Sequence, residues 1–177
     1  MAYRKDALQG AARIISQLRQ IVLQQENALV TIGTLNLQHD SINTIPGHVF
    51  FTIDMRHPDP SVLSGMDQKL RDLVVQVCKE EKLEPEINLI WEAPRVTFDK
   101  ECVEHIRNAI KRFDYSSQEI VSGAGHDACQ MSHVVPTGMI FIPCENGISH
   151  NEIENVEPEH ITAGANVLLH AMLQSTE

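Results

Sequence analysis

The sequence lacks several features that identify broad classes of protein. No apolar run approaches the roughly 18 residues needed to span a bilayer, and the first residues contain no apolar stretch of the kind found in signal peptides. The four cysteines are scattered without a CxxC pair, which favours reduced thiols over a disulfide framework. With a net charge of -10, the chain is a poor partner for nucleic acid or an anionic membrane. These absences predict a cytoplasmic globular protein.

Familiar catalytic devices are also missing. The chain has no phosphate-cradling loop, no HExxH zinc motif, no dinucleotide fingerprint and no Gly-x-Ser-x-Gly nucleophile elbow. What remains is an ordinary globular composition, 42% hydrophobic and 21% charged. A length of 177 residues suffices for one large domain or two small ones. Chemistry must therefore be sought at strand ends and in loops.

Residues 1–93 predict the element order α-β-β-α-β. Apolar side chains at three-four spacing predict two helices, over residues 5–24 and about 61–82, the second capped through Ser61. The expected buried stripes are Leu8, Ala11, Ala12, Ile15, Leu18 and Val22 in the first helix and Leu63, Met66, Leu70, Leu73, Val74 and Val77 in the second. Alternation and β-forming residues predict three strands, over residues 28–37, 48–56 and 86–91, with the first two as an antiparallel pair. This order is that of a ferredoxin-like sandwich, β-α-β-β-α-β, without its first strand.

Residues 94–177 predict a second region in which helices and strands alternate. Helical patterns cover residues 99–113, 127–133 and 158–173, and strand patterns cover 119–122 and 137–143. In the last helix, the residues expected to face inward are Ile161, Ala165, Leu168, Leu169 and Met172. This alternation fits the C-terminal half of an α/β domain. Two strands cannot form a self-sufficient sheet with helices on both faces, so the chain is predicted to be part of a larger fold.

His126 follows a glycine turn in the stretch Ser122-Gly-Ala-Gly-His126-Asp127. Such a turn, with Gly125 in it, lets backbone N–H groups point at an anion. A histidine there can donate a hydrogen bond to a carboxylate or to a tetrahedral oxyanion. The alternative is purely structural: a helix N-cap region in which Asp127 satisfies the free amides.

His150 lies in a polar loop that follows a predicted buried strand. A loop histidine at the carboxyl end of a strand suits a metal ligand or a general base. The alternative is a solvated loop histidine without a function. Since catalytic zinc usually takes about three protein ligands, one histidine does not make a site.

Asn43 and Arg56 bracket the second predicted strand. The Arg56 guanidinium can grip a carboxylate with two hydrogen bonds; the alternative is a surface arginine paired with Asp54 or Asp59. In extended form residues 47–56 span roughly 30 Å, at about 3.3 Å per residue. Both side chains therefore cannot reach one small ligand from a single chain. If both serve one site, they come from different protomers.

Taken together, several motifs resemble the hydantoinase/carbamoylase branch of the aminoacylase-like binuclear metallo-amidohydrolases. That branch contains N-carbamoyl-L-amino acid hydrolases, microbial β-ureidopropionases and allantoate amidohydrolases. The resemblance covers essentially the whole chain. It is carried by Arg4-Lys-Asp-Ala-Leu8, Asn43-Thr-Ile-Pro-Gly47, Asp54-Met-Arg56, Ser122-Gly-Ala-Gly-His-Asp-Ala128, Met139-Ile-Phe-Ile-Pro143 and Gly147-Ile-Ser-His-Asn151.

The resemblance implies a ferredoxin-like lid that dimerises, in residues 1–93, and the C-terminal portion of an α/β catalytic domain, in residues 94–177. It implies that His150 is the last ligand of a centre of two zinc or manganese ions. His126 and Gly125 would contact the substrate near its reacting carbon, with His126 or its counterpart in the lid stabilising the oxyanion. Asn43 and Arg56 would hold the carboxylate of an N-carbamoyl or ureido acid. Each role is an expectation taken from the family.

The complete family mechanism is hydrolytic: two metals activate a water, a glutamate accepts its proton, and hydroxide attacks the carbamoyl or amidine carbon. Family members are much longer chains, and their other metal ligands and their glutamate base have no counterpart here. We therefore expect a C-terminal fragment that is inactive alone, either a truncated gene product or a chain begun at an internal methionine. A non-catalytic dimerisation or regulatory module is the alternative. A small-ligand sensor would leave the Ser149-His-Asn151 motif unexplained.

Overall fold

The structure, a computed structural model, describes residues 3–38 and 41–176. The expected chain start at Met1 and part of the expected polar connection over residues 39–47 lie outside the described residues. The chain divides into two compact units, Met1–Arg95 and Val96–Glu177. Each unit is described by itself, and the functions expected for residues 1–93 and 94–177 stay predictions.

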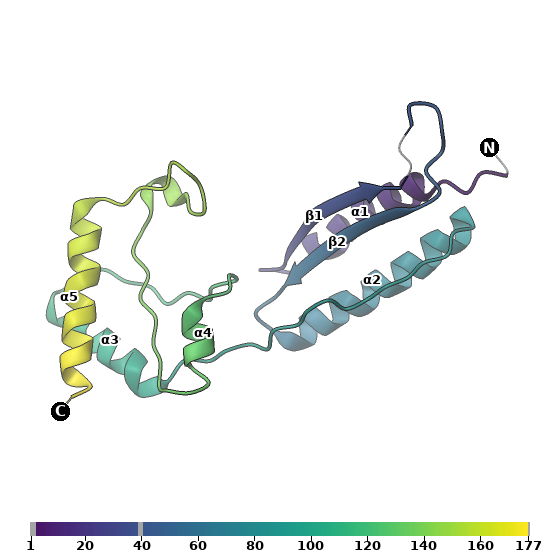
Figure 1. Cartoon of the computed structure of the whole chain (residues 1–177). Helices are drawn as coiled ribbons and strands as arrows, with labels where there is room; N and C mark the ends of the chain where they lie inside the picture. Colours follow the sequence, from purple (N-terminus) through teal and green to yellow (C-terminus); the bar gives the residue numbers. More distant parts are fainter. Residues whose placement is uncertain (1–2, 39–40, 177) are drawn as a thin grey trace. The chain divides into compact units, whose positions relative to one another are not determined.

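The first unit contains two helices and a hairpin (Figure 1). Its elements are α1 (Ala7–Leu23), β1 (Leu29–Leu37), β2 (Val49–Arg56) and α2 (Pro60–Glu81). The two strands pair antiparallel, with Leu29 opposite Arg56 and Leu37 opposite Val49, and the register shifts between Ile32 and Leu35. The two helices and the hairpin expected from the sequence are thus confirmed, with bounds that differ by one or two residues.

Aspartates begin both helices of this unit. The Asp6 carboxylate accepts a hydrogen bond from the Gln9 amide at 3.0 Å at the start of α1. At α2 the cap is Asp59, whose carboxylate accepts a hydrogen bond from the Ser61 amide at 2.8 Å. Hydrogen bonds from the Ser61 hydroxyl and amide lower the pKa of Asp59 below its usual range. The expectation that Ser61 caps this helix was wrong. Pro60 takes the first helical position because it has no amide hydrogen to satisfy there.

The core of the first unit lies between α1, α2 and the inner face of the hairpin. On α2 the expected stripe is confirmed except for Leu63, which is half-buried, and Cys78 joins it. On α1 the buried residue is Ile14 rather than Ile15, and Ala12 is exposed, because positions 11, 14, 18 and 22 share one helical face. The core residues are Ile14, Leu18, Val22, Met66, Leu70, Leu73, Val74, Val77 and Cys78.

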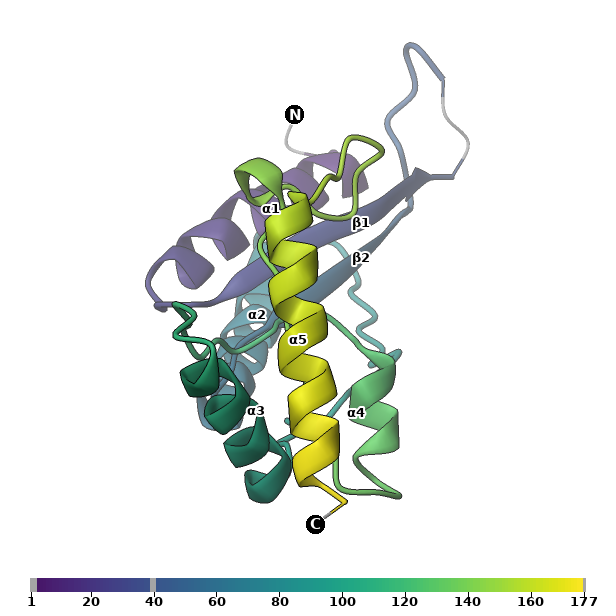
Figure 2. The same ribbon diagram turned by 90° about the vertical axis from the view of Figure 1, so that its left-hand side faces the viewer.

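The second unit is built mainly from helices and irregular segments. Its elements are α3 (Lys100–Arg112), α4 (Asp127–Met131), the short 3-10 helix η1 (Glu145–Gly147) and α5 (Pro158–Gln174). Helices α3 and α5 lie side by side (Figures 1 and 2) around a small core of Ala109, Val167 and Ala171. No helix in the described parts of the chain is both long and apolar enough to cross a membrane.

Two glycines let residues 137–143 approach these helices closely. A Cβ atom at Gly138 would lie 2.9 Å from Cδ1 of Ile106 and 3.2 Å from Cβ of Cys102, both on α3. A Cβ atom at Gly164 of α5 would lie 2.6 Å from Cγ2 of Ile142. The segment is therefore seated against both helices at positions where a side chain would interfere.

Three expected strands were wrong. Residues 86–91, 119–122 and 137–143 form no strand, and the sheet found among the described residues has two strands, β1 and β2. A strand needs a neighbour with which to exchange backbone hydrogen bonds, and these segments find none in the described part of the chain. Leu89, Ile90 and Trp91 are accordingly 67%, 77% and 75% exposed. The mixed helix and strand class is confirmed, whereas the order α-β-β-α-β loses its last strand.

The expected inward face of α5 was also wrong. Its buried residues are Val167 and Ala171, which face α3. The apolar residues predicted to point inward lie on other faces of the helix, outside this small core. Each of four is about half exposed: Ile161, Leu168, Leu169 and Met172.

Candidate functional site

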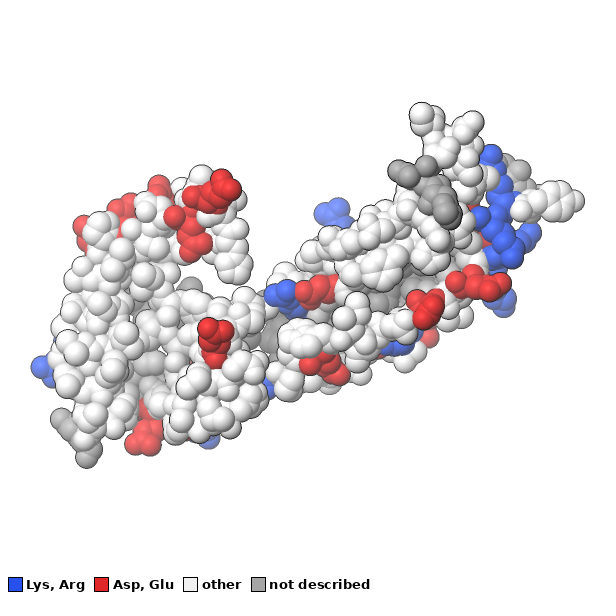
Figure 3. Space-filling view, viewed as in Figure 1, with Lys and Arg blue, Asp and Glu red and all other residues white. Residues whose placement is uncertain are grey.

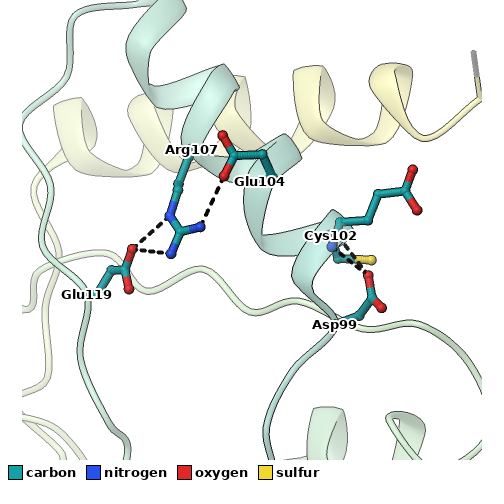
Figure 4. A network of polar contacts seen from close by, with 6 residues as sticks. Asp99, Cys102, Glu104, Arg107 and Glu119 are labelled. Atoms are coloured by element: carbon teal, nitrogen blue, oxygen red, sulfur yellow. Dashed lines mark hydrogen bonds and ion pairs between the residues drawn. The ribbon is translucent and has the colours of Figure 1, made fainter.

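Helix α3 and its N-cap residue contact the segment that precedes the glycine turn and the segment that follows α4. Arg107 donates to Glu119 Oε1 from Nε at 2.7 Å and from Nη2 at 2.5 Å, and to Glu104 at 3.1 Å (Figure 4). Glu119 begins the segment that leads into the turn. The Asp99 amide donates to the Thr137 carbonyl at 3.0 Å, which anchors the start of residues 137–143.

Asp99 also caps α3 with its side chain. Its carboxylate accepts from the Glu101 and Cys102 amides at 2.9 and 3.0 Å (Figure 4). The hydrogen bond from the Cys102 amide lowers the pKa of Asp99 below its usual range. The carboxylate is therefore charged at neutral pH, where it also complements the positive end of the helix dipole.

The glycine turn places His126 against two other side chains. Its Nε2 atom lies 2.6 Å from the Ser122 hydroxyl oxygen, which also accepts the Ala124 amide at 3.2 Å. The imidazole packs edge-to-face on Phe141, with ring centroids 5.4 Å apart and planes at 67°. Ser122, His126 and Phe141 therefore form one cluster, and its imidazole is held on two sides.

His126 occupies the N-cap position of α4. Its carbonyl accepts the Cys129 amide at 2.9 Å, as an N-cap carbonyl does at the start of a helix. The structural alternative is therefore correct about position, but no side chain makes a capping hydrogen bond at this helix. The His126 ring is therefore not used to cap α4.

Gly125 presents open backbone beside this ring. A Cβ atom built there would meet no described atom within 4 Å, and the residue is exposed. A ligand can therefore approach the turn closely from this side. The expected role of Gly125 as a substrate contact stays a prediction.

His150 lies in a loop that is tied together by Glu154. The His150 amide donates to Glu154 Oε2 at 2.8 Å, and the Cys144 thiol contacts Oε1 at 3.7 Å. The His150 backbone is left-handed, with φ of 57°, a conformation that costs a residue with a side chain on the order of 1–3 kcal/mol. The carboxylate of Glu154 holds the backbone in this conformation, and the residue is exposed.

The residues around His150 do not complete a metal centre. Across residues 3–38 and 41–176, no group of three or more His, Cys, Asp or Glu side chains is arranged to hold a metal ion. Acidic side chains do gather over this loop and the start of α5 (Figure 3). Residues 145–159 contain five glutamates, Glu145, Glu152, Glu154, Glu157 and Glu159. They favour the approach of a cation. The predicted ligand role of His150 remains untested.

In the first unit, Asn43 lies in the connection between the strands and Arg56 at the end of β2. Asn43 is exposed and its side-chain oxygen accepts from the Ser41 hydroxyl at 3.3 Å. Since Arg56 pairs with Leu29 while the connection joins the other ends of the strands, the two residues lie at opposite ends of the hairpin. The expected separation is confirmed; their roles as substrate contacts stay predictions.

Arg56 is already engaged within its own strand. Its Nη2 atom lies 2.5 Å from Asp54 Oδ2, and Nε is 3.1 and 3.2 Å from the two carboxylate oxygens. Hydrogen bonding to Arg56 lowers the pKa of Asp54. Pairing with Asp54, one of the two partners considered, is thus observed, whereas Asp59 caps α2.

Ser122 and Phe141 were missed as members of the site. Both lie within motifs that carry the family resemblance, but nothing in the sequence marks either residue as part of a site. A hydroxyl four residues before a histidine, across a glycine turn, was the signal that pointed to the Ser122 contact. Among the described residues no hydrogen bond or ring contact joins the side chains of His126 and His150, so the two predicted histidines do not form one cluster.

Comparison with known proteins identifies the family of this chain. The model of peptidase family M20/M25/M40 matches residues 9–174. An N-carbamoyl-L-amino-acid amidohydrolase from Rhizobium meliloti is 38% identical over 178 residues, covering 100% of this chain and 43% of its own length. An allantoate amidohydrolase from Escherichia coli is 34% identical over 169 residues, with 95% and 41% covered. The chain thus spans less than half the length of these relatives.

Solved structures agree. An amidase of the hydantoinase/carbamoylase family from Burkholderia vietnamiensis is 48% identical with a TM-score of 0.91, over 98% of this chain and 42% of that one. A dinuclear metal binding peptidase of the M20 family from Bacillus subtilis, 18% identical with a TM-score of 0.68, shares the fold over 97% of this chain and 47% of its own. The resemblance to hydantoinase/carbamoylase amidases is therefore confirmed, and this chain belongs to peptidase family M20/M25/M40.

Proposed function

We propose that this chain is the substrate-gripping part of a C–N amidohydrolase that acts on N-carbamoyl or ureido acids. The observation that carries the proposal is the His126 cluster: an imidazole held by Ser122 and Phe141 beside the open backbone of Gly125. Relatives named for N-carbamoyl-L-amino-acid and allantoate hydrolysis support this substrate class.

Each predicted residue has a distinct task in this proposal. A hydrogen bond from the His126 imidazole stabilises negative charge on the oxygen of the reacting carbon, because a preorganised donor needs no rearrangement during the reaction. Arg56 binds the substrate carboxylate through two parallel hydrogen bonds. Asn43 binds the same carboxylate with its side-chain amide.

The positions of Asn43 and Arg56 at opposite ends of one hairpin support a homodimer. The eight residues of β2 alone extend over roughly 26 Å. One small acid cannot bridge that distance, so each site takes Asn43 from one protomer and Arg56 from the other. The first unit is the dimerising lid in this arrangement.

The proposed enzyme uses two divalent ions, zinc or manganese, with His150 as one ligand. A member of the same fold described as a dinuclear metal binding peptidase supports divalent metal in the family. The described residues of this chain do not themselves fit a complete centre. On this proposal the chain alone does not hydrolyse the substrate, and it contributes binding and orientation.

A chimaera tests the proposal. The aligned region of the Rhizobium meliloti amidohydrolase is replaced by this chain, and ammonia release from N-carbamoyl-L-amino acids is measured. We expect turnover, and we expect His126→Gln to lower kcat by roughly 10²- to 10³-fold, the usual cost of removing one oxyanion donor.

The matched control is His105→Gln on α3 of the same unit. His105 is half-buried, and its Nδ1 atom lies 3.0 Å from the Ser175 hydroxyl oxygen, away from the glycine turn. This variant should retain the activity of the parent chimaera. A folded chimaera without turnover, or one in which both histidine variants behave alike, would contradict the proposal.

A second candidate is a non-catalytic dimerisation or regulatory module. It is favoured by one observation, that the first unit has its own hydrophobic core while the described residues bring no metal-binding group together. The DNA upstream of the Met1 codon separates the candidates. An open frame that encodes a His-x-Asp segment supports the amidohydrolase, whereas an in-frame stop codon next to Met1 supports the module.

A further inference from the structure

Ser122 closes the glycine turn by a hydrogen bond to the ring of His126. Its hydroxyl oxygen lies 2.6 Å from Nε2, a short distance for a bond between a hydroxyl and a ring nitrogen. The same oxygen accepts the Ala124 amide at 3.2 Å. Both residues of the pair are half-buried, so the bond is partly shielded from competing water.

The donors and acceptors of this turn can be counted. A serine hydroxyl has one hydrogen to donate and two lone pairs with which to accept. The Ala124 amide uses one lone pair. Among the described residues no acceptor other than Nε2 is recorded for the hydroxyl hydrogen, so donation to Nε2 satisfies the group.

Donation to Nε2 determines where the imidazole carries its own proton. A neutral imidazole has one N–H group and one lone pair, on different nitrogens. If Nε2 accepts from Ser122, the proton is on Nδ1. Phe141 packs against the ring edge-to-face, and this contact restrains the ring plane in which Nδ1–H points.

We propose that Ser122 is a positioning residue that holds His126 in its Nδ1–H form, so that Nδ1 is the atom that donates to the ligand. The assignment of the tautomer depends on the hydrogen-bonding partners within the turn and not on any ligand. The part that concerns the ligand rests on the proposed function.

Nuclear magnetic resonance of the full 177-residue chain tests the tautomer. Protonated and unprotonated ring nitrogens have well separated ¹⁵N shifts, and long-range ¹H–¹⁵N correlations assign each nitrogen within a ring. Spectra are recorded at about pH 8.5, which is about two units above the usual pKa of a histidine, about 6.5. The His126→Gln variant identifies the signals that belong to this residue.

We expect the proton on Nδ1 in the wild-type chain. Ser122→Ala should shift the population toward Nε2–H, and Ser122→Thr, which keeps the hydroxyl, should restore Nδ1–H. The matched control is Ser132→Ala, since Ser132 donates to the Cys129 carbonyl at 2.7 Å at the other end of α4. It should leave the His126 signals unchanged. Nε2–H in the wild type, or an unchanged tautomer in Ser122→Ala, would overturn the positioning role.

Kinetics of the chimaera test the consequence for the ligand. Loss of a partner that orients a functional side chain costs roughly 10- to 100-fold, so Ser122→Ala should lower kcat by that amount and Ser122→Thr should recover it. If Ser122→Ala changes the tautomer but not kcat, the ligand-directed role of Nδ1 is wrong. If the parent chimaera has no turnover, the proposed function fails while the resonance experiment still decides the role of Ser122.

Discussion

Replacing Gly138 by alanine should loosen the contact between residues 137–143 and α3. The new Cβ atom would lie 2.9 Å from Cδ1 of Ile106, 3.2 Å from Cβ of Cys102 and 3.5 Å from the Cys102 carbonyl carbon. Carbon atoms at rest are about 3.5–4.0 Å apart. The end of the Ile106 side chain can turn away, but Cys102 is attached to the helix backbone. The segment itself must therefore retreat by a few tenths of an ångström.

The expected cost combines two opposing effects. Inserting a methyl group into a packed site destabilises by about 1–3 kcal/mol, whereas exchanging glycine for alanine returns about 0.4–1 kcal/mol by restricting the unfolded chain. The difference is a net loss of about 0.5–2 kcal/mol. This corresponds to a roughly 2- to 30-fold rise in the equilibrium constant for local opening.

Hydrogen exchange read by mass spectrometry measures this opening. In Gly138→Ala, amides of α3 and of residues 137–143 should exchange faster, while α1 and α2 keep their rates. Gly65→Ala is the matched control, because a Cβ atom at Gly65 in α2 meets nothing within 4 Å. It should slow exchange in α2, since alanine is the better helix former.

A double substitution separates the two close contacts. Ile106→Val removes the Cδ1 atom and should recover part of the loss in Gly138→Ala, but not the part due to Cys102. The reasoning is wrong if Gly138→Ala exchanges as slowly as the wild type in α3, or if Ile106→Val adds its full separate cost.

Three further predictions concern charge, metal and assembly. The lowered pKa of Asp99 means that its stabilising effect is fully present above the unfolded-state pKa near 3.9 and is lost as pH falls through the folded-state pKa. Circular dichroism should therefore show fraying of α3 in acid for the wild type and not for Asp99→Asn. Identical titrations of the two proteins would contradict this. Elemental analysis of the purified chain should find fewer than two tightly bound divalent ions per chain, and two would overturn the expectation. In the chimaera, mixing an Asn43→Ala chain with an Arg56→Ala chain should restore part of the activity that each lacks, and verified heterodimers without recovery would exclude shared sites.

Helices were predicted well because their signals are local. The stripe from Met66 to Val77 identified the buried face of α2 without knowledge of what it packs against. On α1 the spacing predicted Ile15 as buried, whereas contact with α2 and the hairpin buries Ile14. The cap of α2 was wrongly predicted as Ser61, because Asp59, two residues earlier, suits the start of a helix equally well.

Strands were predicted poorly where their partners are not local. Residues 86–91 alternate as a strand should, but alternation says nothing about which chain segment supplies the hydrogen bonds. The hairpin was predicted correctly because β1 and β2 are neighbours in sequence and satisfy each other's backbone hydrogen bonds.

For the candidate site, the positions were predictable and the contacts were not. Motifs drew attention to His126 and His150, yet the tie between His126 and Ser122 depends on the conformation of the turn between them. The contact with Phe141 depends on how residues 137–143 are held by α3. Neither follows from residue spacing.

In the ion pair between Asp54 and Arg56, the Asp54 carboxylate competes with any ligand carboxylate for the Arg56 guanidinium. A carboxylate that approaches the Nε–Nη2 edge of Arg56 must displace that of Asp54, which is tethered two residues away and stays charged at neutral pH. Tethering of this kind is equivalent to a local concentration in the millimolar range. A ligand that offers a carboxylate and nothing else therefore binds weakly at this position. Discrimination falls to the rest of the ligand, which must contribute enough contacts elsewhere to outweigh the tethered aspartate.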